Sequence, residues 1–117
     1  MRRECLQTFE AGAAVSARRI AKFDANANIV QGAAATDLLI GVIDQAAVLN
    51  QRVEVNLTGQ PEVEAGAAIA AGASITSDAQ GRAVAAAAGQ VAIGFAIVAA
   101  DAAGDIIDIE LGRHTAA

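Results

Sequence analysis

The chain has 117 residues and a formal net charge of −5, a length that suits one domain or one small duplicated unit. Its aromatic side chains are three Phe residues and no basic stripe accompanies them, which argues against nucleic-acid binding. Ala contributes much of the 55% hydrophobic content, and an Ala-rich core buries little apolar area per residue. A core this lean favours assembly with a partner.

Residues 1–9 predict an extended arm or an edge strand, and residues 10–117 predict a single β domain. A terminal segment of this kind becomes ordered only when a neighbour holds it in place. Six apolar or basic side chains near the N-terminus are candidates for contact with a partner: Arg2, Arg3, Leu6, Phe9, Arg18 and Arg19. Surface charges also serve solvation alone, which is the simpler interpretation of the arginines. Because Cys5 is the only Cys, an internal disulfide is excluded.

From Glu10 onward the sequence contains an internal repeat. The segment Glu10-Ala-Gly-Ala-Ala returns 54 residues later as Glu64-Ala-Gly-Ala-Ala, and further matches follow at the same offset. The repeat predicts two pseudo-symmetric halves, at about residues 10–57 and 64–111. Two copies favour a closed pseudo-twofold domain over a solenoid, because a solenoid needs about three or more repeats.

The closing strand of each half has the clearest pattern. Apolar and polar residues alternate in Val53–Leu57, and the same alternation returns in Ile107–Leu111. A period of two predicts a strand with one buried and one solvent-facing side. Arg52, Glu54 and Asn56 are expected on the solvent side.

The other predicted strands are shorter. Ser74–Ser77, the turn Asp78–Gly81 and Arg82–Val84 form a hairpin signal. The apolar runs Leu38–Ile43 and Val91–Val98 correspond at an offset of 53, which places a one-residue insertion before the last strand. Both runs indicate strands that are buried on two faces. Ala-rich stretches raise the helix propensity, but no apolar stripe of period 3.6 accompanies them. We therefore expect an all-β fold, a small β-barrel or β-sandwich with an extended N-terminal arm.

The reactive side chains do not support an enzyme. The only His, His114, lies in the predicted C-terminal tail 112–117, and one His with one Cys cannot supply a zinc site. The Asp residues fall in predicted turns or on solvent-facing strand positions, without the alternate spacing of a calcium loop. The sequence therefore predicts no catalytic, cofactor-binding or metal-binding residue.

A series of segments, taken in order, carries a family resemblance: Glu10-Ala-Gly-Ala-Ala, Lys22-Phe-Asp, Ala35–Val42, Arg52–Gly59, Glu62-Val-Glu, Asp78–Val84 and Ile93-Gly-Phe. Together these segments resemble the small capsid decoration, or cement, proteins of tailed bacteriophages. The resemblance covers about residues 10–111. It rests on the order of the segments, since Ala- and Gly-rich β sequence is common.

The resemblance implies a compact, β-tulip-like domain that binds the outer surface of a phage capsid. Its partner would be the major capsid protein, and it would stabilise the shell by bridging subunits of that protein. A homotrimer is favoured, with a dimer as the alternative. The resemblance places the protein in the virion after synthesis in the cytoplasm of the bacterial host. It implies no cofactor, no membrane contact and no direct contact with nucleic acid.

Two alternative functions stay open at the level of sequence. Biotinyl and lipoyl carrier domains are also small β units with two similar halves, and they need a modifiable Lys at a hairpin tip. The only Lys, Lys22, lies in a predicted strand instead. The other alternative is a structural subunit of another phage assembly, such as a tail or shell component.

Overall fold

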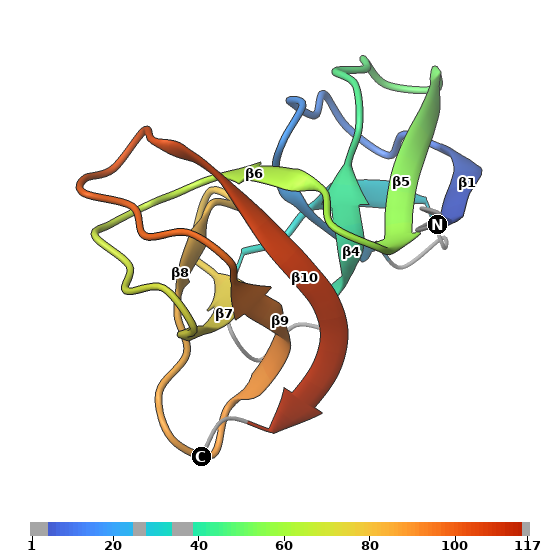
Figure 1. Cartoon of the computed structure of the whole chain (residues 1–117). Coiled ribbons are helices and arrows are strands. Elements are labelled where there is room, and N and C mark those ends of the chain that lie inside the picture. The colour runs from blue at the N-terminus through green and yellow to red at the C-terminus, as the bar shows by residue number, and fades with distance from the viewer. Residues whose placement is uncertain (1–4, 25–27, 34–38, 116–117) are drawn as a thin grey trace.

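The computed structural model describes residues 5–24, 28–33 and 39–115, which form ten strands and no helix. The first half contains β1 (Cys5–Glu10), β2 (Ile20–Phe23), β3 (Ile29–Gln31), β4 (Leu39–Ile43) and β5 (Arg52–Thr58). The second half contains β6 (Glu62–Glu64), β7 (Ser74–Ser77), β8 (Ala83–Ala85), β9 (Val91–Ala96) and β10 (Ile106–Thr115). Figure 1 shows the two groups of strands side by side, with β10 as a long curved strand. The all-β prediction is confirmed, and the described residues contain no helix fit to span a membrane.

Each half forms one antiparallel five-stranded sheet, and the two sheets have the same strand order. The first sheet runs β1-β5-β4-β2-β3 and the second runs β6-β10-β9-β7-β8. Each strand of the second sheet thus occupies the place of the strand five positions earlier in the chain. The two sheets pack together as a sandwich-like fold, with the curved β10 beside β5 (Figure 1).

Hydrogen bonds between loops and strands recur in both halves. Gly12 N–H donates to the Ile29 carbonyl at 2.8 Å, and Gly66 N–H donates to the Ala83 carbonyl at 2.7 Å. A reciprocal pair of backbone bonds likewise joins Val15 to Ala47 and, in the second half, Ile69 to Ala100. We call two residues equivalent when they occupy the same place in the two halves. Their offset is 54 residues, except for 53 between Leu39 and Ala47.

The strand β1 belongs to the duplication, although the sequence repeat starts only at Glu10. It pairs with β5 in antiparallel fashion, with Glu10 opposite Arg52, just as β6 pairs with β10 and Glu64 lies opposite Ile106. β1 is an edge strand of the first sheet. The division into an arm of residues 1–9 and a domain of residues 10–117 stays a prediction.

The described residues form two hydrophobic cores. One consists of first-half residues alone, among them Val15, Ile29 and Val53. The other is built mainly from the second half but also takes in three side chains from the first sheet: Ile20, Leu39 and Val42. Adjacent residues of β4 therefore pack on opposite sides of the first sheet, as its continuous apolar run predicted.

Three of the sequence predictions differ from the structure. Val91 and Phe95 of β9 are 46% and 43% exposed, so β9 is not buried on both faces. Among the described residues, the second half covers β4, but no sheet covers β9 in the same way. Asn56 was expected on the solvent side of β5 but is only 5% exposed, because it lies near the junction of the halves. The predicted tail 112–117 is strand as far as Thr115, since His114 and Thr115 pair with β9.

The connection between the halves is short and held in place. It runs from Gly59 to Pro61, and both of these residues are buried. Leu111 N–H donates to the Gly59 carbonyl at 2.9 Å, and Ile109 N–H donates to the Pro61 carbonyl at 3.1 Å. The linker is therefore bonded along β10 and does not act as a free hinge.

Candidate functional site

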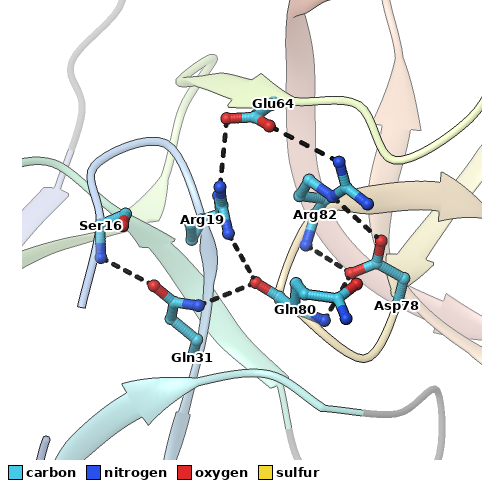
Figure 2. Close-up of polar contacts among 7 residues, drawn as sticks. All are labelled: Ser16, Arg19, Gln31, Glu64, Asp78, Gln80 and Arg82. Atoms are coloured by element: carbon cyan, nitrogen blue, oxygen red, sulfur yellow. Dashed lines mark hydrogen bonds and ion pairs between the residues drawn. The ribbon is translucent and has the colours of Figure 1, made fainter. Parts of the chain in front are cut away.

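A turn of the second half presents its backbone to the first half (Figure 2). Asp78 Oδ1 accepts hydrogen bonds from the N–H groups of Gln80 and Arg82, both at 2.8 Å, and Asp78 Oδ2 lies 3.3 Å from Arg82 Nε. An Asp that bonds its own turn in this way fixes the local backbone. Gly81 completes the turn with a φ of 78°, which Gly adopts at little cost.

Two first-half side chains converge on this turn. Arg19 Nη1 donates to the Gln80 carbonyl at 2.9 Å, and Gln31 Nε2 donates to the same oxygen at 2.8 Å (Figure 2). Gln31 is held in turn from behind, because its Oε1 accepts a hydrogen bond of 2.8 Å from Ser16 N–H. The Gln80 carbonyl is thus a fixed point of attachment between the halves.

Glu64 stands between two arginines at the same place. Its Oε1 lies 3.4 Å from Arg19 Nη2, and its Oε2 lies 3.9 Å from Arg82 Nη1. The three side chains keep 19–28% of their exposure, so solvent still screens the pairs. At such distances and exposures each ion pair contributes at most about 1 kcal/mol. Of the two pairs, Arg19–Glu64 joins the halves, whereas Arg82–Glu64 lies within the second half and holds the Glu64 carboxylate in place.

Backbone bonds complete the junction. Ile20 N–H donates to the Gly81 carbonyl at 2.6 Å, and Glu64 N–H donates to the Arg18 carbonyl at 2.9 Å. Arg18 adopts a φ of 62°, in the left-handed region that non-Gly residues rarely occupy. The chain therefore accepts backbone strain where the first half meets β6.

The described polar contacts of the junction join non-equivalent positions. In the first half they involve residues 18–20 and Gln31, whereas in the second half they involve the turn at Gln80 and the strand β6. A pseudo-twofold contact would use the same surface on both halves. The described polar contacts therefore do not repeat from one half to the other, and the closed pseudo-twofold arrangement stays a prediction. The halves are alike in fold, and β4 and β5 contact their equivalent strands β9 and β10.

One Ser–His pair invites a comparison with catalytic dyads. His114 Nδ1 lies 2.9 Å from the Gly112 carbonyl, to which it donates, and Nε2 lies 2.8 Å from Ser74 Oγ, from which it accepts when the ring is neutral. Both contacts are exposed, and no carboxylate of the described residues is bonded to the ring, unlike in a hydrolase triad. Elsewhere in the described ranges, no group of three His, Cys, Asp or Glu residues is placed to hold a metal ion.

A loop between β4 and β5 carries two large apolar side chains into solvent. Val48 and Leu49 are 57% and 58% exposed. The loop is preformed: Val48 N–H donates to Gln51 Oε1 at 3.0 Å, Gln51 N–H donates to the Val48 carbonyl at 3.0 Å, and Asn50 has a φ of 69°. A fixed loop that exposes apolar area is a suitable contact surface for another protein.

The equivalent loop of the second half has the same turn but smaller side chains. Ala102 N–H donates to Asp105 Oδ2 at 3.2 Å, as Val48 N–H donates to Gln51. The positions of Val48 and Leu49 are occupied by Ala102 and Ala103. Only the first half therefore presents a large apolar tip at this place.

The residues that the sequence suggested for contact with a partner do not lie together in the part of the chain that the structure describes. Arg2 and Arg3 lie outside the described residues. The backbone of Leu6 pairs opposite Asn56 in β1, while Phe9 packs against the first-half core and makes an edge-on contact with Phe23, with ring centroids 5.4 Å apart.

The two arginines of the first half lie at the junction. Arg18 is about half exposed and lies 3.4 Å from Glu62, and Arg19 makes the contacts described above. Both side chains thus have partners within the chain. Their role in binding another protein stays a prediction.

Sequence reasoning missed Val48, Leu49 and Phe95 as candidate contact residues. The signal for the first two was an apolar dipeptide inside the predicted loop before the closing strand. For Phe95 no such signal existed, because its run of apolar neighbours is typical of a buried strand.

Comparisons with known proteins agree with the architecture. The solved structure of the head fiber gp8.5 N base of bacteriophage phi29 superposes with a TM-score of 0.74 at 20% sequence identity, covering 94% of this chain and 95% of that chain. At this identity the match concerns the fold. No curated protein matches the sequence. The sequence model of the phage cement protein family matches residues 3–111. The chain therefore belongs to the phage cement protein family and is a capsid-associated structural protein of a phage.

Proposed function

We propose that the protein binds the outer surface of the capsid and stabilises the shell by bridging neighbouring subunits of the major capsid protein. Family membership supports association with the capsid. The observation that carries the finer proposal is the preformed loop with Val48 and Leu49, which holds two apolar side chains clear of the domain. Because the loop is already fixed, binding would cost little conformational entropy. Binding energy would then stabilise the shell by mass action.

The loop is tested by the double variant Val48→Ala, Leu49→Ala, which copies Ala102 and Ala103 of the second half. The fold is expected to persist because the equivalent loop has the same hydrogen bonds with these residues. Co-sedimentation with isolated empty heads should show a dissociation constant raised at least about tenfold. The control, Val98→Gln, copies the equivalent Gln45 and should bind within about twofold of the unchanged chain. If the double variant binds heads with unaltered affinity, the Val48 and Leu49 loop does not contribute to capsid binding.

The N-terminal arm is a second candidate for capsid contact. Deleting residues 1–9 would also remove most of β1, so a deletion of residues 1–4 is the cleaner test. We expect lower occupancy on heads, since Arg2 and Arg3 are lost while the edge strand remains. Occupancy equal to that of the full chain would leave the arm without a role. If the full chain itself fails to bind heads or to raise their melting temperature, the proposed function is wrong.

The two alternative functions have specific tests. Lys22 lies within β2, opposite Val30, and not at a hairpin tip where a carrier lysine would sit. An intact mass without an adduct after co-expression with a biotinyl or lipoyl ligase would exclude the carrier function. A cryo-EM map of the particle would separate decoration of the head from a place in another phage assembly.

A further inference from the structure

Three large apolar side chains lie on the outer face of the second sheet, away from its core. Phe95, Ile97 and Ile106 are 43%, 38% and 45% exposed. The pairing of β9 with β10 continues past Ala96, because Ile97 N–H donates to the Asp108 carbonyl at 3.0 Å. Residues directly opposite each other in an antiparallel pair share one face of the sheet. We call Phe95, Ile97 and Ile106 the apolar strip.

Alternation along β10 places carboxylates beside the strip. Ile107 and Ile109 point into the core, so Ile106, Asp108 and Glu110 point to the outer face. Asp108 is exposed and is directly opposite a residue of the strip on β9. The apolar side chains and the acidic ones therefore form one continuous surface.

The surroundings of the strip are acidic throughout. From Val91 to Leu111 the chain contains no Lys and no Arg, and its charged residues are all acids: Asp101, Asp105, Asp108 and Glu110. Apart from Glu110, which is partly buried, these acids are exposed. A partner that covers the strip is therefore met by negative charge at its rim.

The first half shows that the framework does not require apolar residues here. Ile97 and Ile106 are equivalent to Asp44 and Arg52, which are both exposed. The backbone is the same at this place, since Asp44 N–H donates across the sheet to the Glu54 carbonyl at 2.8 Å. Folding of the half therefore does not account for Ile97 and Ile106. Exposed apolar residues that gather on one face are typical of a contact surface.

The strip has open space at its side. Gly72 N–H donates to the Ala96 carbonyl at 2.7 Å, which places Gly72 beside the end of β9. A Cβ added at Gly72 would have no heavy atom within 4 Å among the described residues. A partner can therefore approach the strip from the side of β7 without displacing any of them.

Charge decides which partner fits this surface. The partner needs apolar side chains for the strip and Lys or Arg side chains for the acids around it. A second copy of this chain is poorly suited, because its net charge is −5 and its Arg18, Arg19 and Arg82 already pair with carboxylates of the same chain. The complementary partner is therefore a different protein with a basic surface.

We propose that the strip is a second capsid-contact surface, which binds a basic segment with apolar side chains on the outside of the major capsid protein. This inference rests on the proposed function. Figure 1 shows the loop between β4 and β5, which carries Val48 and Leu49, on the opposite side of the molecule from the start of β10. The two contacts therefore reach different subunits of the shell. One contact is apolar alone, and the other is apolar and electrostatic.

The apolar part is tested by the double variant Ile97→Asp, Ile106→Arg. It copies Asp44 and Arg52 of the first half, and the two added charges cancel. Circular dichroism and melting temperature should match those of the unchanged chain. Co-sedimentation with isolated empty heads should show a dissociation constant raised at least about tenfold.

The electrostatic part is tested by Asp108→Lys, with Glu54→Lys as its matched control. Glu54 is equivalent to Asp108 and is also exposed, so both variants change the net charge equally. At about 50 mM salt, Asp108→Lys should raise the dissociation constant for heads about tenfold, and Glu54→Lys should stay within about twofold. At about 500 mM salt, the difference between the two variants should shrink, because salt screens exposed charges.

Contact with two subunits predicts a result that a single contact does not. Adding Val48→Ala and Leu49→Ala to the strip variant should multiply the two fold-changes in affinity, since separate contacts contribute independently. The strip variant should also raise the melting temperature of heads less than the unchanged chain does when both are compared at equal occupancy. It then holds one subunit but no longer links it to the next.

The outcomes separate this inference from the proposed function. Binding of the strip variant with unaltered affinity overturns the inference, and so do equal effects of Asp108→Lys and Glu54→Lys. If the unchanged chain fails to bind heads, the proposed function and the inference are both wrong. If the unchanged chain self-associates without heads and the strip variant does not, the strip binds a second copy and the inferred partner is wrong.

Discussion

The two halves of the molecule share a backbone framework and differ in how far other parts of the chain cover their sheets. Both have the same strand order and the same bonds between loops and strands. In the first half, however, the sheet is packed on two sides, while in the second half Phe95 and Val91 face solvent. The fold is thus specified by features that recur in both halves, and the mode of association by features that do not.

The recurring features are mostly small residues and backbone bonds. Gly12 and Gly66 each lie against an Asp carboxylate, and Gly41 and Gly94 each lie against the carbonyl of a neighbouring strand. By contrast, the left-handed positions Arg18 and Asn50 of the first half correspond to Gly72 and Gly104 of the second. Glycine is thus essential where two parts of the chain touch and replaceable where only φ requires it.

The largest expected effect comes from substitutions that disrupt the shared backbone framework in either half. A Cβ at Gly41 would overlap the Asn56 carbonyl, and a Cβ at Gly94 would overlap the Glu110 carbonyl. Because backbone cannot move aside as a side chain can, Gly41→Ala and Gly94→Ala should each lower the free energy of unfolding by at least about 3 kcal/mol. Denaturant unfolding followed by circular dichroism measures this. A loss below about 1 kcal/mol in one variant alone would show that the two halves are not alike here.

The second prediction exchanges equivalent residues between a covered and an open face. Ile20→Ser places in the first half the residue found at Ser74, and it should cost about 3–4 kcal/mol, since Ile20 is fully buried in the core shared by the halves. Ser74→Ile makes the reverse change on the open face and should alter the free energy of unfolding by less than about 0.5 kcal/mol. Both values come from urea unfolding at low protein concentration. If both variants lost the same free energy of unfolding, the face at Ile20 would not be more covered than the face at Ser74.

The smallest effect concerns the polar contacts of the junction. Arg19→Ala removes two contacts, but Gln31 still donates to the Gln80 carbonyl and Arg82 remains near Glu64, so the loss should be about 1 kcal/mol. The neighbouring control, Arg18→Gly, copies Gly72 and relieves the left-handed φ. It should leave the free energy of unfolding within about 0.5 kcal/mol of the unchanged chain, because the exposed pair with Glu62 contributes little. If Arg18→Gly lost more free energy of unfolding than Arg19→Ala, Arg18 would be the arginine that contributes more to the junction.

Local pattern predicted much of the fold. The hairpin signal at residues 74–84 matches β7, β8 and the Asp78 turn, and the alternation in Val53–Leu57 matches β5. These features depend on near neighbours in sequence, and turn chemistry and period express them directly. The misassigned positions, Asn56, Phe95 and His114, depend on what lies across from a strand. A repeat in sequence does not reveal how its two copies meet.

The candidate contact residues were harder to find for the same reason. Phe and Arg side chains are usual candidates for contact with a partner. In the structure, however, Phe9, Arg18 and Arg19 each contact a neighbour within the chain. Val48 and Leu49 are exposed because a particular turn lifts them away from the domain. Whether an apolar residue is covered is a property of the tertiary arrangement, which composition and spacing do not determine.

The bonded linker from Gly59 to Pro61 makes the junction between the halves an intramolecular contact. Within one chain it holds the two halves at an effective concentration of roughly millimolar or more, so the internal junction needs little intrinsic affinity. Two separate halves would have no such tether and would meet only at their dilute free concentration. A chain that is cut in the linker would therefore lose this advantage although it keeps every contact of the junction.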